Sequence, residues 1–376
     1  RSANQEALRL FELGVDSSRR VDGPATAQPL ELALRLEAIG AMMALGHIDD
    51  IFSNMESAEA IAMGLNDQRA LASIATQTAV FLWMRGRFEQ GLAHATKGLE
   101  AARMAQRRHM QMAAHQTRLM NLHALGRYAE ASEEGNTLLQ SYEPELAQHR
   151  MQPGWAAIPV INLCSFHAST LWRLGDLPAA QAICDKAYAV LRDVDHPYSS
   201  LLIDLVQGQI WMEQGRFDEA EALLARSVQT CKTRSVPTML AVCTGALGHA
   251  LACNGKATEA AALLESGFAE RICDAAGPYA RIFMRVGLGM AYRMQGRWSD
   301  AISTGRQAVE QSGEEYGHCT EALFELGQTL RAAGDIEGAG ETFTQALGAA
   351  TRLGMPYYQR GCSEALASLK DERHRA

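Results

Sequence analysis

Apolar and small residues recur along this chain with a period of about 40 residues. Each unit has an apolar segment, then a glycine, then a second segment that begins with an apolar or aromatic residue in most units. The aligned glycines are Gly46, Gly86, Gly126, Gly175, Gly215, Gly255, Gly296 and Gly334. A period of this length predicts stacked pairs of antiparallel helices, with the glycine ending the first helix of each pair.

Small side chains occupy two further positions of the repeat. They are Ala131, Ala180, Ala220, Ala260, Ala301 and Ala339 after the glycine, and Gly208, Gly248, Gly289 and Gly327 before it. Small residues there allow the two helices of a pair to approach closely. The pattern predicts an all-α superhelix of about eight helix-turn-helix repeats over residues 31–376, preceded by a capping helix or linker in residues 1–30.

One interval between the glycines is longer than the others, and it contains the segment "SYEPELAQHRMQPGWAAIP" at residues 141–159. Proline cannot continue a helix interior, so this segment is expected to loop between helices. Two interpretations remain open. The segment is either an insertion that packs over the edge of the solenoid or a loop that gates a binding groove, with Trp155 as an apolar anchor.

The motifs "LGQTLRAAGDIEGAGETFTQAL" (326–347) and "VGLGMAYRMQGRWSDAISTGRQAV" (286–309) resemble the tetratricopeptide repeat. The segments "LELALRLEAIGAMMALGHIDD" and "DHPYSSLLIDLVQGQIWMEQGRFDEAEALL" are also similar to the C-terminal repeat regions of large bacterial regulators. Those regulators join a cyclase-like or DNA-binding module to a signalling ATPase. The resemblance implies a non-catalytic region that binds an effector or partner and controls the attached domains.

Composition and motifs restrict the possible functions. A net charge of −8 provides no basic surface for nucleic acid. The sequence has no phosphate loop, catalytic signature or metal-ligand spacing, so we expect no enzyme activity, cofactor or metal. The uncharged segment 235–254 is long enough to test as a membrane span, but its position in the repeat favours a buried core helix.

Other features suggest where the protein is found. The eight cysteines are scattered without a CxxC pair, which favours reduced thiols of a cytoplasmic protein. The chain opens "RSANQEALRL", without a secretory leader and without methionine, which suggests a segment cut from a longer protein.

The most plausible function is a protein-protein interaction and effector-sensing module of a cytoplasmic bacterial signalling or transcription-regulatory protein. Its partner would be a protein, a peptide or another domain of the same polypeptide, and neither nucleic acid nor membrane is expected to bind. The alternative is a stand-alone helical-repeat receptor that binds a small peptide or metabolite in its concave groove.

The repeat frame of the resembled family places the first helix of each pair on the concave side. In that frame the residues two, three, six, nine, ten and thirteen positions before the turn glycine point into the groove. The predicted groove residues are Gln77, Trp83, Gln116, His123, Phe166, Trp172, Arg173, Gln209, Glu213, His249, Arg293, Glu325, Gln328 and Arg331. Buried core positions are expected to be less polar than these. The alternative is that they form only the solvated side of each helix. Trp172 and Arg173 are the expected centre of recognition, because Trp and Arg are enriched in binding hot spots, and Arg293 and Arg331 are expected to attract acidic groups.

Overall fold

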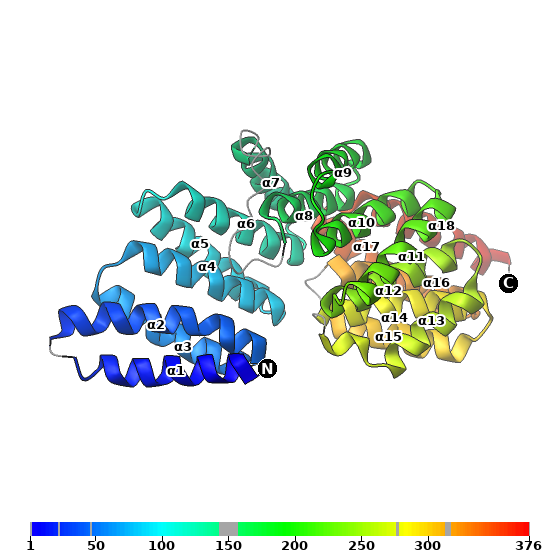
Figure 1. Cartoon of the computed structure of the whole chain (residues 1–376). Helices are drawn as coiled ribbons and strands as arrows, with labels where there is room; N and C mark the ends of the chain where they lie inside the picture. Colours follow the sequence, from blue (N-terminus) through cyan, green and yellow to red (C-terminus); the bar gives the residue numbers. More distant parts are fainter. Residues whose placement is uncertain are drawn as a thin grey trace. The chain divides into compact units, whose positions relative to one another are not determined.

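The computed structural model describes residues 2–21, 23–45, 47–142, 157–275, 278–312 and 317–375, and the regular elements in these ranges are all helices (Figure 1). The chain divides into two compact units, Arg1–Asn121 and Leu122–Ala376. The N-terminal unit contains α1 (Ser2–Ser18), α2 (Pro24–Leu45), α3 (Ile48–Gly64), α4 (Gln68–Met84), α5 (Phe88–Met104) and most of α6 (Arg108–Ala124).

The C-terminal unit continues the same helical pattern from the end of α6. Its helices are α7 (Tyr128–Tyr142), α8 (Pro159–Arg173), α9 (Leu177–Leu191), α10 (Pro197–Glu213), α11 (Phe217–Thr233), α12 (Pro237–Cys253), α13 (Ala257–Ala269), the short 3-10 helix η1 (Ile272–Ala275), α14 (Pro278–Met294), α15 (Trp298–Ser312), α16 (Gly317–Ala332), α17 (Ile336–Leu353) and α18 (Pro356–Arg375). The expected all-α solenoid is therefore confirmed.

The predicted turn glycines end the first helix of each pair. Gly86, Gly126, Gly175, Gly215, Gly255, Gly296 and Gly334 all have positive φ angles, whereas Gly46 lies outside the described residues. The amide after each of the seven glycines donates a hydrogen bond to a carbonyl near the end of the preceding helix, as the Arg87 amide does to the Leu82 carbonyl at 2.9 Å. Glycine is favoured because a left-handed residue closes this helix end without steric cost.

The small residues of the repeat are where the paired helices meet. The six alanines after the glycine are all fully buried. A Cβ atom added at Gly248 would lie 2.6 Å from Cδ1 of Leu264, so the α12–α13 pair has no room for a side chain there. Gly289 differs because it faces Gly305, and an added Cβ would lie 3.8 Å from the Gly305 amide nitrogen. Each pair thus sets its own helix spacing.

The N-terminal region is a helix pair. Helix α2 runs through residue 30, where the sequence suggested a boundary, and α1 packs against α2. Leu8 of α1 and Leu32 of α2 belong to one core cluster that also includes Ile51 and Met55 of α3. Apolar burial thus joins α1 and α2 to the first repeat.

The proline-rich insertion is described only at its ends. Helix α7 ends at Tyr142 and α8 begins at Pro159, while residues 143–156, Trp155 among them, lie outside the described residues. An insertion over the solenoid edge and a loop that gates a groove therefore both stay predictions.

The uncharged segment 235–254 forms α12, which is a core helix as predicted. Most of its residues are buried. They form the largest part of a core cluster that also includes residues of α10, α11, α13 and α14. Among the described residues, no helix is both long enough and apolar enough to cross a membrane.

Within the C-terminal unit, the third and fourth repeats contact the end of the chain. Tyr128 at the start of α7 is 3% exposed and packs in one cluster with Phe343 of α17. A Cβ added at Gly175 would lie 2.8 Å from Cγ of Pro356, the first residue of α18. In an open solenoid each repeat contacts only its neighbours. These contacts therefore close residues 122–376 into one superhelical turn.

Candidate binding face

The first helices of successive repeats form one layer of the C-terminal unit. Helices α8, α10, α12, α14, α16 and α18 each contact the next one in this series, and each of α8 to α16 also packs on the second helix of its own pair. This layer, which we call the inner layer, carries most of the predicted groove residues. The structure therefore places those residues on neighbouring helices of one layer.

Trp172, Arg173 and Glu213 form a contact between α8 and α10. The indole Nε1 of Trp172 donates a hydrogen bond to Oε2 of Glu213, and the Arg173 guanidinium carbon lies 4.3 Å from the Trp172 ring centroid. Burial raises the pKa of the Glu213 carboxyl, and Trp172 and Arg173 oppose this shift only in part. The sequence predicted all three residues, and the structure brings them together.

Arg173 also forms an ion pair across the superhelical turn. Its Nη2 lies 3.2 Å from Oε2 of Glu321 on α16, and both side chains are 4% exposed. Nδ1 of His318 lies 3.6 Å from the same carboxylate oxygen. Burial raises the pKa of Glu321, but Arg173 and His318 outweigh burial and lower that pKa to about 2. The carboxylate is therefore charged at neutral pH.

Two further charged residues that the sequence predicted, Arg293 and Arg331, contact a neighbouring helix of the inner layer. Nη2 of Arg293 on α14 lies 2.8 Å from Oε2 of Glu325 on α16. Nη2 of Arg331 donates a hydrogen bond to Oγ of Ser368 on α18 at 2.6 Å. Gln328 lies with Arg331 on a pocket between α16 and α18. Arg293, which was expected to attract acidic groups, thus already pairs with Glu325 of the same chain.

His123 and Phe166 meet between α6 and α8. Their ring centroids are 5.8 Å apart, and Nδ1 of His123 lies 2.9 Å from Oγ1 of Thr170. Burial, with a smaller contribution from Arg173 and His318, lowers the pKa of His123 to about 3. The imidazole is therefore neutral at pH 7 and acts as a packing and hydrogen-bonding group.

Two further predicted residues of the inner layer are partly buried. Gln209 lies on α10, and the ring of His249 on α12 lies 6.4 Å from the ring of Phe283 on α14. The N-terminal unit holds the other three predictions. Nε2 of Gln77 donates a hydrogen bond to Oγ of Ser73 at 2.9 Å, Trp83 is partly buried, and Gln116 is 0% exposed.

Two predicted groove residues depart from the expectation that buried positions would be less polar. Gln116 is fully enclosed in α6, and Arg173 is 6% exposed. Offset from the turn glycine gives the direction of a side chain, but it does not show what packs against that side. For Arg173, α16 covers the side chain and provides its carboxylate partner. Neither residue lies on an open surface.

The sequence reasoning missed several residues of this face. Glu321 stands thirteen residues before Gly334, an offset within the frame, so its charge was a usable signal. Tyr357 and Arg360 lie on α18, which follows the last turn glycine and therefore had no repeat frame. The described part of the chain contains no group of three or more His, Cys, Asp or Glu residues placed to bind a metal ion.

Comparisons with known proteins agree with this architecture. Profiles of the tetratricopeptide repeat match residues 167–234, 241–266 and 280–352. No curated protein matches the chain in amino-acid sequence.

Two solved structures are similar in fold. A Rap protein in complex with competence and sporulation factor has a TM-score of 0.56 at 12% identity, over 91% of this chain and 98% of the other. A signal-transduction ATPase with a tetratricopeptide-repeat sensor, from Pyrococcus horikoshii, has a TM-score of 0.51 at 12% identity. That match covers 91% of this chain but 50% of the ATPase. At such identities the similarity concerns the fold alone.

Proposed function

The chain is a solenoid of tetratricopeptide repeats, and we propose that it binds an effector peptide or partner protein on the inner layer of residues 122–376. A protein-protein interaction module is the function this repeat supports. The more specific proposal is an effector-sensing region of a cytoplasmic bacterial signalling or transcription regulator. Its ligand would be a protein segment or another domain of the same polypeptide.

The observation that carries the proposal is the concentration of aromatic and charged side chains on the inner layer. Trp172 and Glu213 are only partly buried there and are hydrogen-bonded to each other, and Arg293 pairs with Glu325 beyond them. Buried ion pairs contribute little net stability, because desolvation offsets their attraction. A binding role accounts for polar groups at these positions better than stability does, since such groups can exchange their partners for those of a ligand.

Binding can be tested by selecting peptides from a random display library against the whole chain and measuring their affinity. We expect the Glu213→Gln variant to lose about tenfold or more in affinity, because it removes a charge-assisted contact from the inner layer. Glu259→Gln on α13 is the matched control, since Glu259 is exposed on a second helix and the charge change is the same. Circular dichroism should show unchanged helix content in both variants.

Two outcomes would contradict the proposal. One is that no peptide is enriched over a column without protein. The other is that selected peptides bind the Glu213→Gln and Glu259→Gln variants equally well. The regulatory context is tested separately by the gene that encodes this segment. Coding sequence for an ATPase or output domain in the same reading frame would support it, and a self-contained reading frame would argue against it.

The second candidate function is a receptor for a small peptide or metabolite. A pocket of about 340 Å³ between α16 and α18 favours it, because this volume suits a small ligand. The similarity in fold to a Rap protein solved with competence and sporulation factor supports either candidate. The two differ in the size of the ligand rather than in the surface used.

A further inference from the structure

Arg173 connects two residues of the inner layer, Trp172 and Glu213, to α16. We call Trp172 and Glu213 the binding pair. The Arg173 guanidinium carbon lies 4.3 Å from the Trp172 ring centroid, and the Trp172 indole donates a hydrogen bond to Glu213 of α10. Nη2 of the same guanidinium lies 3.2 Å from Oε2 of Glu321 on α16. One side chain therefore contacts both the binding pair and α16.

The connected side chains differ in their burial. Arg173 and Glu321 each have a side chain that is 4% exposed, whereas Trp172 and Glu213 are only partly buried. A ligand on the inner layer can therefore reach the binding pair, but it cannot reach Arg173 unless other side chains move. Any effect of Arg173 on such a ligand must then pass through the binding pair.

Stability alone does not explain an arginine at this buried position. Within the described residues, Nε and Nη1 of Arg173 have no hydrogen-bond partner, although every nitrogen of a guanidinium carries a donor hydrogen. Burying donors without partners costs free energy, and an apolar pair in place of Arg173 and Glu321 would avoid that cost. What an apolar side chain could not supply is a flat, charged group over the indole.

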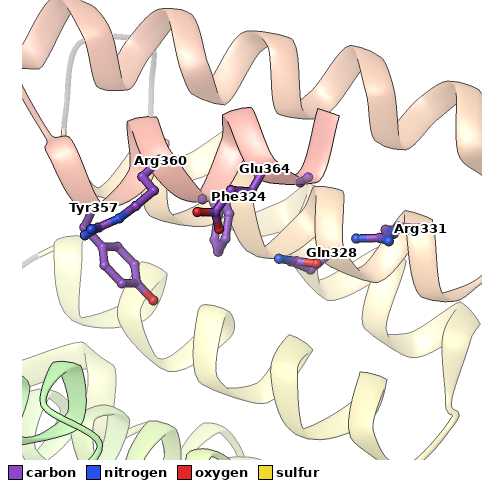
Figure 2. Close-up of a pocket in the computed structure, with 8 residues that line it drawn as sticks. Phe324, Gln328, Arg331, Tyr357, Arg360 and Glu364 are labelled. Carbon is purple, nitrogen blue, oxygen red and sulfur yellow. The ribbon is translucent and has the colours of Figure 1, made fainter. Parts of the chain in front are cut away.

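Two positively charged side chains act on the Glu213 carboxyl, and one of them stacks on Trp172. Burial raises the pKa of this carboxyl, while the Trp172 indole, Arg173 and Arg360 lower its pKa. Arg360 is exposed on α18, and Figure 2 shows it beside Tyr357 at one end of the pocket between α16 and α18. Positive charge near Glu213 thus has two sources, whereas the stacking comes from Arg173.

We propose that Arg173 is a positioning residue for the binding pair. Its guanidinium holds the Trp172 indole in the orientation that donates to Glu213, and Glu321 holds the guanidinium. The ligand would contact Trp172 and Glu213 but not Arg173. This inference rests on the proposed function, because it describes how the inner layer holds two binding residues in one arrangement before a ligand arrives.

The first test follows the Trp172 indole N–H in the whole chain without any ligand. NMR on isotope-labelled tryptophan measures how fast each indole proton exchanges with water, and Trp172→Phe assigns the signal. Arg173→Lys keeps the positive charge but removes the flat group over the ring. We expect this variant to accelerate exchange at Trp172 by about tenfold and to leave Trp211 of α10 unchanged.

Two control variants separate stacking from charge and from the type of substitution. Arg216→Lys makes the same change at a second stack, since the Arg216 guanidinium carbon lies 4.7 Å from the Trp211 ring centroid. Arg360→Gln removes a charge that acts on Glu213 but leaves the stack on Trp172 in place. We expect neither variant to alter exchange at Trp172. If Arg360→Gln accelerated that exchange as much as Arg173→Lys does, charge alone would explain the effect and the proposal would be overturned.

Glu321→Gln tests the contact that holds Arg173 from α16. The amide can still accept a hydrogen bond, but it no longer carries the counter-charge of the guanidinium. We therefore expect a smaller acceleration at Trp172, by about threefold, with Trp211 again unchanged. Unchanged exchange at Trp172 in either Arg173→Lys or Glu321→Gln would overturn the proposal. Equal acceleration at Trp172 and Trp211 would do so as well, because it would show a general loss of stability.

Binding of a library-selected peptide distinguishes positioning from direct contact. Arg173→Lys should weaken binding by about fivefold in the unchanged chain but by less than about twofold in Trp172→Phe, which has no indole N–H to orient. The same loss in both backgrounds would show that Arg173 contacts the ligand itself and would overturn the proposal. If no peptide binds, the proposed function fails, while indole exchange still decides whether Arg173 positions Trp172.

Discussion

Nη2 of Arg173, the last residue of α8, lies 3.2 Å from Oε2 of Glu321 on α16, although the two residues are 148 positions apart in the chain. The pair joins the fourth repeat to the eighth. The same parts of the chain also meet through apolar side chains, since Leu174 and Leu353 both pack against one core cluster. The C-terminal unit is therefore held both by contacts between neighbouring repeats and by a contact that closes the superhelical turn.

The closing ion pair can be tested with a double-mutant cycle. Arg173→Met and Glu321→Gln should each lower the free energy of unfolding, by about 3–5 kcal/mol, because each leaves a buried charge without its main counter-charge. The double variant should lose clearly less than the sum of the two, since neither charge then remains. Chemical denaturation measures all four proteins, and additive losses would show that the pair does not couple the two repeats.

A second test of closure uses Gly317 at the start of α16. An added Cβ there would collide with the hydroxyl of Tyr128, so Gly317→Ala should destabilise by about 1–3 kcal/mol. Tyr128→Phe in the same chain should restore part of the loss, because it removes the colliding oxygen. Gly348→Ala on α17 is the control, since nothing lies within 4 Å of its added Cβ. If Gly317→Ala and Gly348→Ala have the same denaturation midpoint, the contact is absent in solution.

The stability of the chain should fall in mild acid because of His123. Burial, with Arg173 and His318, lowers the pKa of His123 to about 3. The unfolded chain therefore takes up a proton as pH falls through the ordinary histidine value, while the folded chain does so only near pH 3. Because of this one group, the free energy of unfolding should fall by on the order of 2 kcal/mol between pH 7 and pH 5. Glu321, whose pKa is about 2, adds a further loss only at lower pH.

Urea denaturation at several pH values checks this expectation. The His123→Asn variant should lose less stability between pH 7 and pH 5 than the unchanged chain. His109→Asn is the control, since His109 is exposed on α6, and it should leave the pH dependence unaltered. The same slope in all three proteins would mean that His123 is not buried as a neutral ring.

Two glycines at the same place in the repeat should respond oppositely to alanine. Gly248→Ala should destabilise by about 1–3 kcal/mol, because its Cβ would press on Leu264. Gly289→Ala should instead stabilise by about 0.5–1 kcal/mol, since an added Cβ makes ordinary contacts opposite Gly305 and alanine favours the helix. Thermal unfolding measures both. If both variants lost the same amount of stability, the helix spacing would not differ between the two pairs.

These glycines show what the sequence could and could not establish. The turn glycines and the buried alanines follow from local rules, so their positions were predictable from the repeat. The closing contact was not, because it depends on small rotations that add up over several helix pairs. Arg173 illustrates the difference. Its offset placed it on the inner side of α8, but only the full superhelix brings Glu321 opposite to it.

The candidate site was predictable to a similar extent. The frame identified Trp172, Glu213 and Arg331, because each lies on a first helix at a regular offset from a glycine. It could not reach Tyr357 or Arg360, since α18 has no turn glycine after it. The pocket needs both helices, so its existence was not visible from the repeat alone.

The central claim is that the inner layer of residues 122–376 receives the ligand, and hydrogen-deuterium exchange tests it most directly. The measurement compares the whole chain with and without a peptide selected from the display library. We predict slower exchange in α8, α10 and α16 and unchanged exchange in α9, α11 and α15. Slower exchange confined to those second helices, or to residues 1–121, would contradict the claim.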